Sequence, residues 1–208
     1  NSTQINKVMN GDASGGEHFG SSVSQWGNYL AVGAQDGDKT YVYWVEDNGS
    51  LIELATLDAP DGESNSQFGY SVSMDDGILA VGAKWSDQDG FSNSGAAYVY
   101  QIEQNGSVQY LQKLVPSDSN ASDNFGYSIS VSDHFLAVGS PYDDHDGIVN
   151  AGSSYLYRVE QNGTVSYLSK VTSSDANASD KFGSSVSLSG NLLAVGAYDD
   201  DHAGGIDA

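Results

Sequence analysis

The chain has 208 residues, no cysteine, and 28 acidic against 7 basic residues, for a formal net charge of −21. Such a charge repels nucleic-acid phosphates and anionic lipid headgroups, so we expect no nucleic-acid partner and no insertion into a membrane. The lack of cysteine excludes disulfides and thiolate metal sites, and the regular order of tyrosine, valine, leucine and glycine speaks against disorder.

The predicted elements begin with a strand at residues 5–9, which aligns with residues 111–115 because both stand at the same distance before a Phe-Gly pair. After each Phe-Gly we expect a strand, a tight turn, a second strand at Leu-Ala-Val-Gly, and a third strand at Tyr-Val-Tyr. An Asn-Gly pair, which suits the positive φ angles of a type I′ turn, then leads to a fourth strand such as residues 108–114. We call these strands a, b, c and d.

Three markers recur in one register along the chain. Phe-Gly begins at Phe19, Phe68, Phe125 and Phe182, so the first interval is shorter than the two equal intervals that follow, and the other two markers keep these spacings. Four-stranded repeats of this length are typical of propeller blades. The sequence therefore predicts an all-β, β-propeller-like array of four-stranded antiparallel blades, with about 3.7 repeats. A parallel β-helix is the alternative, but its turns are usually much shorter.

The whole chain, 1–208, is predicted to be one repeat array. Its segments are strand d and the loop of a preceding blade at 1–18, blades at 19–67, 68–124 and 125–181, and a partial blade with strands a and b at 182–208. Because strand c of the last blade is missing, we expect further blades, from the same protein or from other chains, to complete a ring.

The order of the three markers resembles the FG-GAP repeat of integrin α-subunit propellers and of many bacterial surface proteins. The third copy fits the family's name best, with Phe125-Gly126 followed by Gly139-Ser140-Pro141. The resemblance implies a seven-bladed propeller, an extracellular location, and a role in adhesion or ligand display. The integrin-type calcium loop between strands a and b is replaced here by a short turn, so the chain is more similar to the bacterial-type subgroup.

Acidic residues recur instead in the loop between strands b and c. Aspartates that alternate around a glycine supply the hard oxygens that Ca²⁺ prefers, so we predict Ca²⁺ in at least one of these loops. The predicted metal ligands are Asp87, Asp89, Asp143, Asp144, Asp146, Asp199, Asp200 and Asp201. The alternative is that these aspartates only form turns. His145 and His202, at equivalent loop positions, are interpreted as solvated residues.

No nucleophile elbow and no Ser-His-Asp set is apparent, and acid pairs that recur in every blade indicate structure, so we expect no enzyme activity. The sequence thus predicts a secreted or cell-surface, calcium-binding structural or adhesive module whose loop face binds a protein or a glycan. Two alternatives stay open: a carbohydrate-binding, lectin-like propeller, and a non-catalytic accessory region of an exported enzyme.

Overall fold

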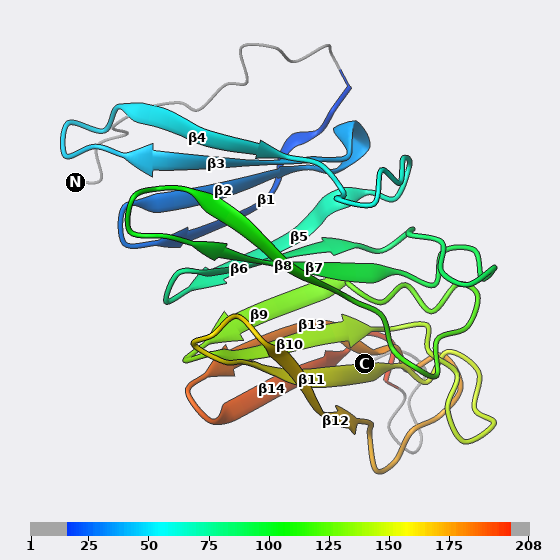
Figure 1. Ribbon diagram of the computed structural model, residues 1–208. Helices are drawn as coiled ribbons and strands as arrows, with labels where there is room; N and C mark the ends of the chain where they lie inside the picture. Colours follow the sequence, from blue (N-terminus) through cyan, green and yellow to red (C-terminus); the bar gives the residue numbers. More distant parts are fainter. Residues whose placement is uncertain (1–15, 201–208) are drawn as a thin grey trace, which may run out of the picture.

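The computed structural model describes residues 16–200, whose strands form four antiparallel sheets (Figure 1). The first sheet contains β1 (Phe19–Trp26), β2 (Tyr29–Ala34), β3 (Lys39–Val45) and β4 (Leu51–Leu57). The second contains β5 (Phe68–Asp75), β6 (Ile78–Ala83), β7 (Ala96–Ile102) and β8 (Val108–Leu114). The third contains β9 (Ser128–Ser132), β10 (Phe135–Ser140), β11 (Ser153–Val159) and β12 (Val165–Val171). The fourth contains β13 (Phe182–Ser189) and β14 (Leu192–Ala197), and a short 3₁₀ turn, η1 (Gln35–Gly37), follows β2.

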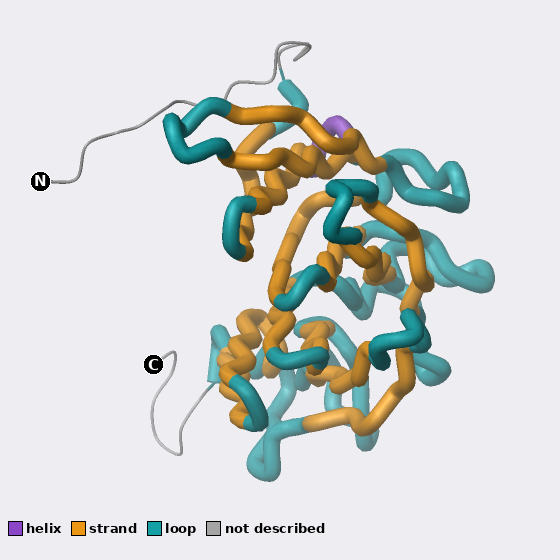
Figure 2. Tube along the Cα trace, turned by 60° about the vertical axis from the view of Figure 1, so that its left-hand side comes forward, coloured by secondary structure: helices purple, strands orange, loops and turns teal. Residues whose placement is uncertain are grey.

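The sheets are arranged as blades along an arc (Figure 2). Within each four-stranded sheet the strands follow chain order, and β1, β5, β9 and β13 lie against one another in succession. The predicted all-β, propeller-like array of four-stranded antiparallel blades is confirmed. Over residues 16–200 the array does not close, since the sheet β1–β4 and the sheet β13–β14 lie at opposite ends of the arc in both views. The strand predicted at residues 5–9 lies outside the described residues.

Both faces of β6 in the second blade are buried, which explains why this strand is a continuous apolar run. Leu79 and Val81 pack toward the first sheet, whereas Ile78 and Ala80 pack toward the third, and all four side chains are at most 1% exposed. Burying one such aliphatic side chain stabilises a fold by about 1.5–3 kcal/mol. The two clusters between consecutive sheets therefore contain most of the core of the described residues, and a smaller third cluster lies within the first sheet.

Glycine in strand b is required by the close approach of the next blade. A Cβ atom at Gly82 would lie 2.1 Å from the carbonyl oxygen of Gly126, which belongs to the next Phe-Gly pair. Ser71 completes the contact, because its Oγ donates a hydrogen bond of 2.7 Å to that same carbonyl. The Phe-Gly and Val-Gly markers are thus two sides of one contact between blades.

The predicted Asn-Gly hairpins form, but the prediction of a type I′ turn was wrong. In the first hairpin the Gly49 N–H donates to the Glu46 carbonyl at 2.8 Å, and Gly49 alone of the pair has a positive φ, at 81°. This is a type I turn followed by a left-handed glycine. Asn48 contributes its side chain instead, since its Oδ1 accepts a 2.7 Å hydrogen bond from the Ser50 N–H.

Candidate functional site

The long loops that join strand b to strand c, and strand d to the next strand a, gather at one end of the blades, on the right of Figure 1. Most of the predicted metal ligands lie in the first kind of loop. Short turns occupy the opposite end. Any candidate site that these acidic residues build therefore belongs to the long-loop end.

In the third blade, a lysine is the partner of the predicted metal ligand Asp143. The Lys170 Nζ lies 2.7 Å from Asp118 Oδ2 and 2.8 Å from Asp143 Oδ2. The hydroxyls of Ser153 and Tyr155 also donate to Asp143, which is 1% exposed. Burial alone would raise the pKa of Asp118, but the hydrogen bond and charge of Lys170 outweigh it and lower that pKa. The cluster is therefore a hydrogen-bonded ion pair network in which one ammonium is shared by two carboxylates.

The second blade contains the same network with two residues exchanged. Lys113 forms an ion pair with Asp61 and lies 3.5 Å from Glu63, and the Tyr98 hydroxyl donates to Asp61 at 3.1 Å. Ser86 stands where the third blade has Asp143, and it donates to Glu63, which supplies the second carboxylate. Burial would raise the pKa of Asp61, but Lys113 lowers it overall. Two blades thus reach one arrangement by different sequences.

The Asp-x-Asp-Gly segments form small hairpins, in which the second aspartate is a turn residue. Asp89 and Gly90 have φ angles of 52° and 90°, and Asp146 and Gly147 have 54° and 79°. Consecutive left-handed residues define a type I′ turn, for which Asp-Gly is a favoured pair. The Asp146 side chain is 91% exposed. This conformation accounts for the Asp-Gly pairs without a bound ion.

The first aspartate of each segment closes its loop. Asp87 Oδ1 accepts a 2.8 Å hydrogen bond from the Asn93 N–H, and Asp144 Oδ1 accepts one of 2.7 Å from the Asn150 N–H. Both backbone donors lie in the part of the loop that leads into strand c. These carboxylates therefore bond to backbone, and the predicted calcium ligands do not converge on one point.

The fourth repeat offers no closer grouping. Asp199 accepts a hydrogen bond from Lys181, Asp200 lies at the end of the described residues, and Asp201 lies outside them. Across residues 16–200, no three aspartate, glutamate or histidine side chains lie together in a way that could hold a metal ion. The described residues do not fit a Ca²⁺ site, so calcium binding stays a prediction from the sequence.

Two polar side chains at this end are buried, which the sequence did not predict. Asp123 is 3% exposed and accepts a 2.6 Å hydrogen bond from the Asn120 N–H. Burial, opposed by that hydrogen bond and assisted by the charges of Asp143 and Asp144, raises the pKa of Asp123 to about 7. The side chain of His145 is 9% exposed, its Nδ1 lies 3.7 Å from Asp146 Oδ2, and neither ring nitrogen has a hydrogen-bond partner among residues 16–200, so the interpretation of this histidine as solvated was wrong. Its counterpart His202 lies outside the described residues.

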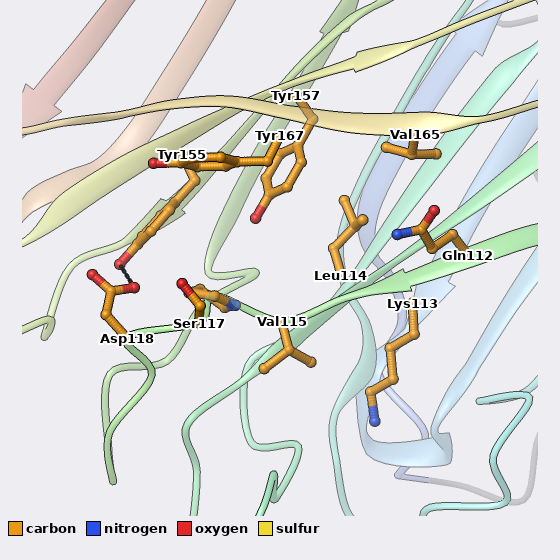
Figure 3. A pocket seen from close by; sticks show the side chains of 11 residues that line it. Gln112, Lys113, Leu114, Val115, Ser117, Asp118, Tyr155, Tyr157, Val165 and Tyr167 are labelled. Carbon is orange, nitrogen blue, oxygen red and sulfur yellow. Dashed lines mark hydrogen bonds between the residues drawn. The ribbon is translucent and has the colours of Figure 1, made fainter.

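A cleft of about 360 Å³ opens between the second and third blades (Figure 3). One wall is residues 112–118, from β8 and the loop after it, and the other is formed by tyrosines of β11 and β12. The rings of Tyr157 and Tyr167 meet edge to face with centroids 5.7 Å apart, and Tyr167 is 57% exposed. Burial and the neighbouring Tyr167 and Asp118 raise the pKa of Tyr157, so its hydroxyl keeps its proton. The cleft therefore offers aromatic surface beside hydroxyl, amide and carboxylate groups.

The tyrosine pair recurs one blade earlier. Tyr100 and Tyr110 are paired across β7 and β8, with centroids 5.6 Å apart, and Tyr110 is 41% exposed. The Tyr100 hydroxyl is buried and has no hydrogen-bond partner among the described residues. In the first blade the residue opposite Tyr43 is Glu53, so the pair belongs to two of the three complete blades. The exposed member was recognisable in the sequence, because Tyr110 and Tyr167 occupy the same position of consecutive repeats.

The FG-GAP repeat model matches residues 2–50, 52–100, 109–157 and 166–208. The chain belongs to the FG-GAP repeat family. The family's unit is offset from the blade: its second match starts in strand d, at β4, and ends in strand c of the next blade, at β7. The Phe-Gly pair thus lies inside each unit.

Among similar solved structures, one has a TM-score above 0.5 and supports the fold. The computationally designed Ika4 protein has a TM-score of 0.56 at 14% identity, over 96% of this chain and 95% of that one. The periplasmic gluconolactonase PpgL of Pseudomonas aeruginosa has a TM-score of 0.49 at 16% identity, over 82% of this chain and 40% of its own. A DUF4623 family protein from Bacteroides eggerthii has a TM-score of 0.49 at 12% identity, over 88% of this chain and 41% of its own. No curated protein matches the chain. Residues 16–200 contain no helix of the length and apolar character that a membrane crossing needs.

Proposed function

We propose that this FG-GAP chain is an extracellular, non-enzymatic adhesive module that binds a neutral glycan beside the tyrosine pairs of its second and third blades. The observation that carries the proposal is the cleft at Tyr157 and Tyr167, together with the second pair at Tyr100 and Tyr110. FG-GAP membership supports the extracellular location.

The chemistry of the cleft suits a sugar ring. Tyrosine supplies a large, stiff apolar face for the C–H side of a pyranose, and its hydroxyl is a donor and acceptor for sugar hydroxyls. Gln112 and Asp118 add an amide and a carboxylate at the same cleft. A small number of polar groups around an aromatic surface is the usual composition of a ligand pocket.

Charge narrows the class of glycan. A net charge of −21 repels sulfated or sialylated chains, so the expected ligand is a neutral oligosaccharide. Because the tyrosine pair recurs in two blades, two equivalent sites on one chain would let a weak single-site affinity add up on a multivalent surface. This is the behaviour expected of an adhesive module.

The state of the two carboxylates that pair with lysine supports a non-enzymatic role. A glycosidase requires one carboxyl group as acid and a second as base or nucleophile. Asp61 and Asp118 are each held by a lysine, with their pKa values lowered, and the network repeats from blade to blade. Such carboxylates stabilise the fold, and we assign them no catalytic step.

The test is an array of neutral and acidic oligosaccharides, followed by calorimetric titration of any ligand found. Tyr110→Ala and Tyr167→Ala should each weaken binding, and the double variant should abolish it. Phe91→Ala is the matched control, because Phe91 is also exposed, at 41%, but does not line the cleft. Absence of neutral glycan binding, or equal binding by the double variant, overturns the proposal, and a protein ligand is then the candidate to test.

A further inference from the structure

The contact between successive blades is built from the same serine hydrogen bonds three times. The first facing serine of strand a donates to the Phe-Gly carbonyl of the next blade, in the pairs Ser22 to Gly69, Ser71 to Gly126 and Ser128 to Gly183, at 2.7–2.8 Å. The second facing serine accepts a backbone N–H from the next strand a, in the pairs Ser24 with Met74, Ser73 with Val131 and Ser130 with Leu188, at 2.9 Å. Serines of strand a therefore take part in all six bonds.

The sheet β13–β14 presents this surface with no described residue covering it. Ser185 and Ser187, which occupy the two serine positions, are exposed, and their hydroxyls have no hydrogen-bond partner among the described residues. Leu192 is 71% exposed, whereas Ile78, its counterpart in the second blade, is 1% exposed. A Cβ at Gly196 would meet no carbonyl of another described blade, unlike its three counterparts. We call Ser185, Ser187, Leu192 and Gly196 the C-terminal face.

The first sheet presents the complementary surface, which residues 16–200 also leave open. A Cβ at Gly20 would meet nothing within 4 Å, whereas one at Gly69 would lie 2.3 Å from the Lys39 carbonyl of the preceding blade. Val23 is 64% exposed, and its counterpart Val72 is 8% exposed. We call Gly20, Val23 and the adjoining backbone of β1 the N-terminal face. Both halves of one repeated contact are thus open on the described part of the same chain.

We infer that two copies of this chain dock head to tail, with the N-terminal face of each copy against the C-terminal face of the other. The two faces of one copy cannot meet each other, because they lie at opposite ends of the open arc (Figure 2). A contact between unlike faces closes into a ring when the rotation between the copies allows it and otherwise forms an open filament, so the inferred dimer requires each arc to supply half of a ring. The inference rests on the blade contacts and is independent of the proposed glycan ligand.

The residues of the two faces are uncharged, while each copy carries a net charge of −21. Long-range repulsion therefore opposes docking, and salt screens it. Sedimentation of the full chain should show a monomer–dimer equilibrium whose dimer fraction rises with protein concentration and with sodium chloride. A chain that stays monomeric up to its solubility limit in high salt overturns the inference. A series of masses growing beyond the dimer overturns it as well.

Charge substitutions locate the contact. Val23→Arg and Leu192→Arg each place an unpaired charge in one face, and each should weaken the dimer about a hundredfold or more. Val149→Arg is the control, because Val149 is 56% exposed in a loop outside both faces, and it should dimerise like the unaltered chain. All three positions are exposed, so circular dichroism and melting should match the unaltered chain.

Mixing identifies the head-to-tail geometry. An equal mixture of the Val23→Arg and Leu192→Arg chains retains one intact contact per mixed pair, so it should form dimers that neither variant forms alone. If the mixture stays monomeric, or if either variant dimerises normally by itself, the two faces are not partners.

Discussion

Replacement of Lys170 tests the ion pair network of the third blade. Lys170→Met keeps a long apolar stem but removes the ammonium that lies 2.7 Å from Asp118 and 2.8 Å from Asp143. Asp118 is 49% exposed in its side chain and can turn toward water, whereas Asp143 is 1% exposed and is left as a buried charge. Removing one member of a buried pair costs about 3–5 kcal/mol. Because the Lys170 side chain is 20% exposed, partial screening lowers our expectation to about 2–4 kcal/mol.

The second blade provides the matched rescue. Ser86 occupies the position of Asp143, so the double variant Lys170→Met with Asp143→Ser removes the buried charge and introduces a side chain already compatible with this fold. Urea unfolding followed by circular dichroism should show a large loss for the single variant and recovery of more than half of it in the double. A loss below about 0.5 kcal/mol for the single variant, or no recovery in the double, refutes the reasoning.

Three further predictions concern stability. The folded state raises the pKa of Asp123 from 3.8 to about 7, so the stability that this residue contributes is full below pH 4 and is lost as pH rises to about 7. Between pH 4 and pH 8 the ionisation of Asp123 should lower the free energy of unfolding of the unaltered chain by about 2–4 kcal/mol, as measured by urea unfolding. The Asp123→Asn chain, whose side chain does not ionise, should lack this decrease, and an unchanged pH profile would contradict the prediction. Gly139→Ala places a Cβ 2.0 Å from the Gly183 carbonyl oxygen and should lower the free energy of unfolding by more than about 3 kcal/mol. Gly147→Ala is the control, because its Cβ would meet nothing within 4 Å, and its φ of 79° alone should cost about 1 kcal/mol. Equal losses for the two variants would refute the packing role of Gly139. Because the aspartates of these loops bond to backbone, we expect the same melting midpoint in millimolar Ca²⁺ and in chelator. If calcium does bind, as the sequence predicted, Ca²⁺ should raise the midpoint, and Asp144→Ala with Asp146→Ala should reduce that gain.

The blade architecture was predictable because its markers are steric requirements. Glycine is needed at Gly82 and Gly139, where a Cβ would lie 2.1 Å and 2.0 Å from a carbonyl oxygen of the next blade. No other residue type fits there, so the glycine repeats at the spacing of the blades. The turn type at Asn48-Gly49 was not predictable from the pair alone, because Asn-Gly is compatible both with a type I′ turn and with a type I turn followed by glycine.

The site was less predictable, since it depends on pairings that the sequence does not display. Asp-Gly suits a calcium loop and a type I′ turn equally, and only the backbone angles of Asp89 and Asp146 distinguish them. The network around Lys170 joins residues 52 positions apart, a separation that no local sequence pattern displays. Alignment of the repeats contained the missing signal, because Lys113 and Lys170 occupy equivalent positions in consecutive blades.

Stoichiometry of glycan binding tests the central functional claim most directly. Calorimetric titration with a neutral oligosaccharide selected on the array should give two sites per chain, one at Tyr100 and Tyr110 and one at Tyr157 and Tyr167. Tyr167→Ala should reduce this to one site of unchanged affinity. Two sites remaining after that substitution, or no heat with any neutral glycan, would contradict the account.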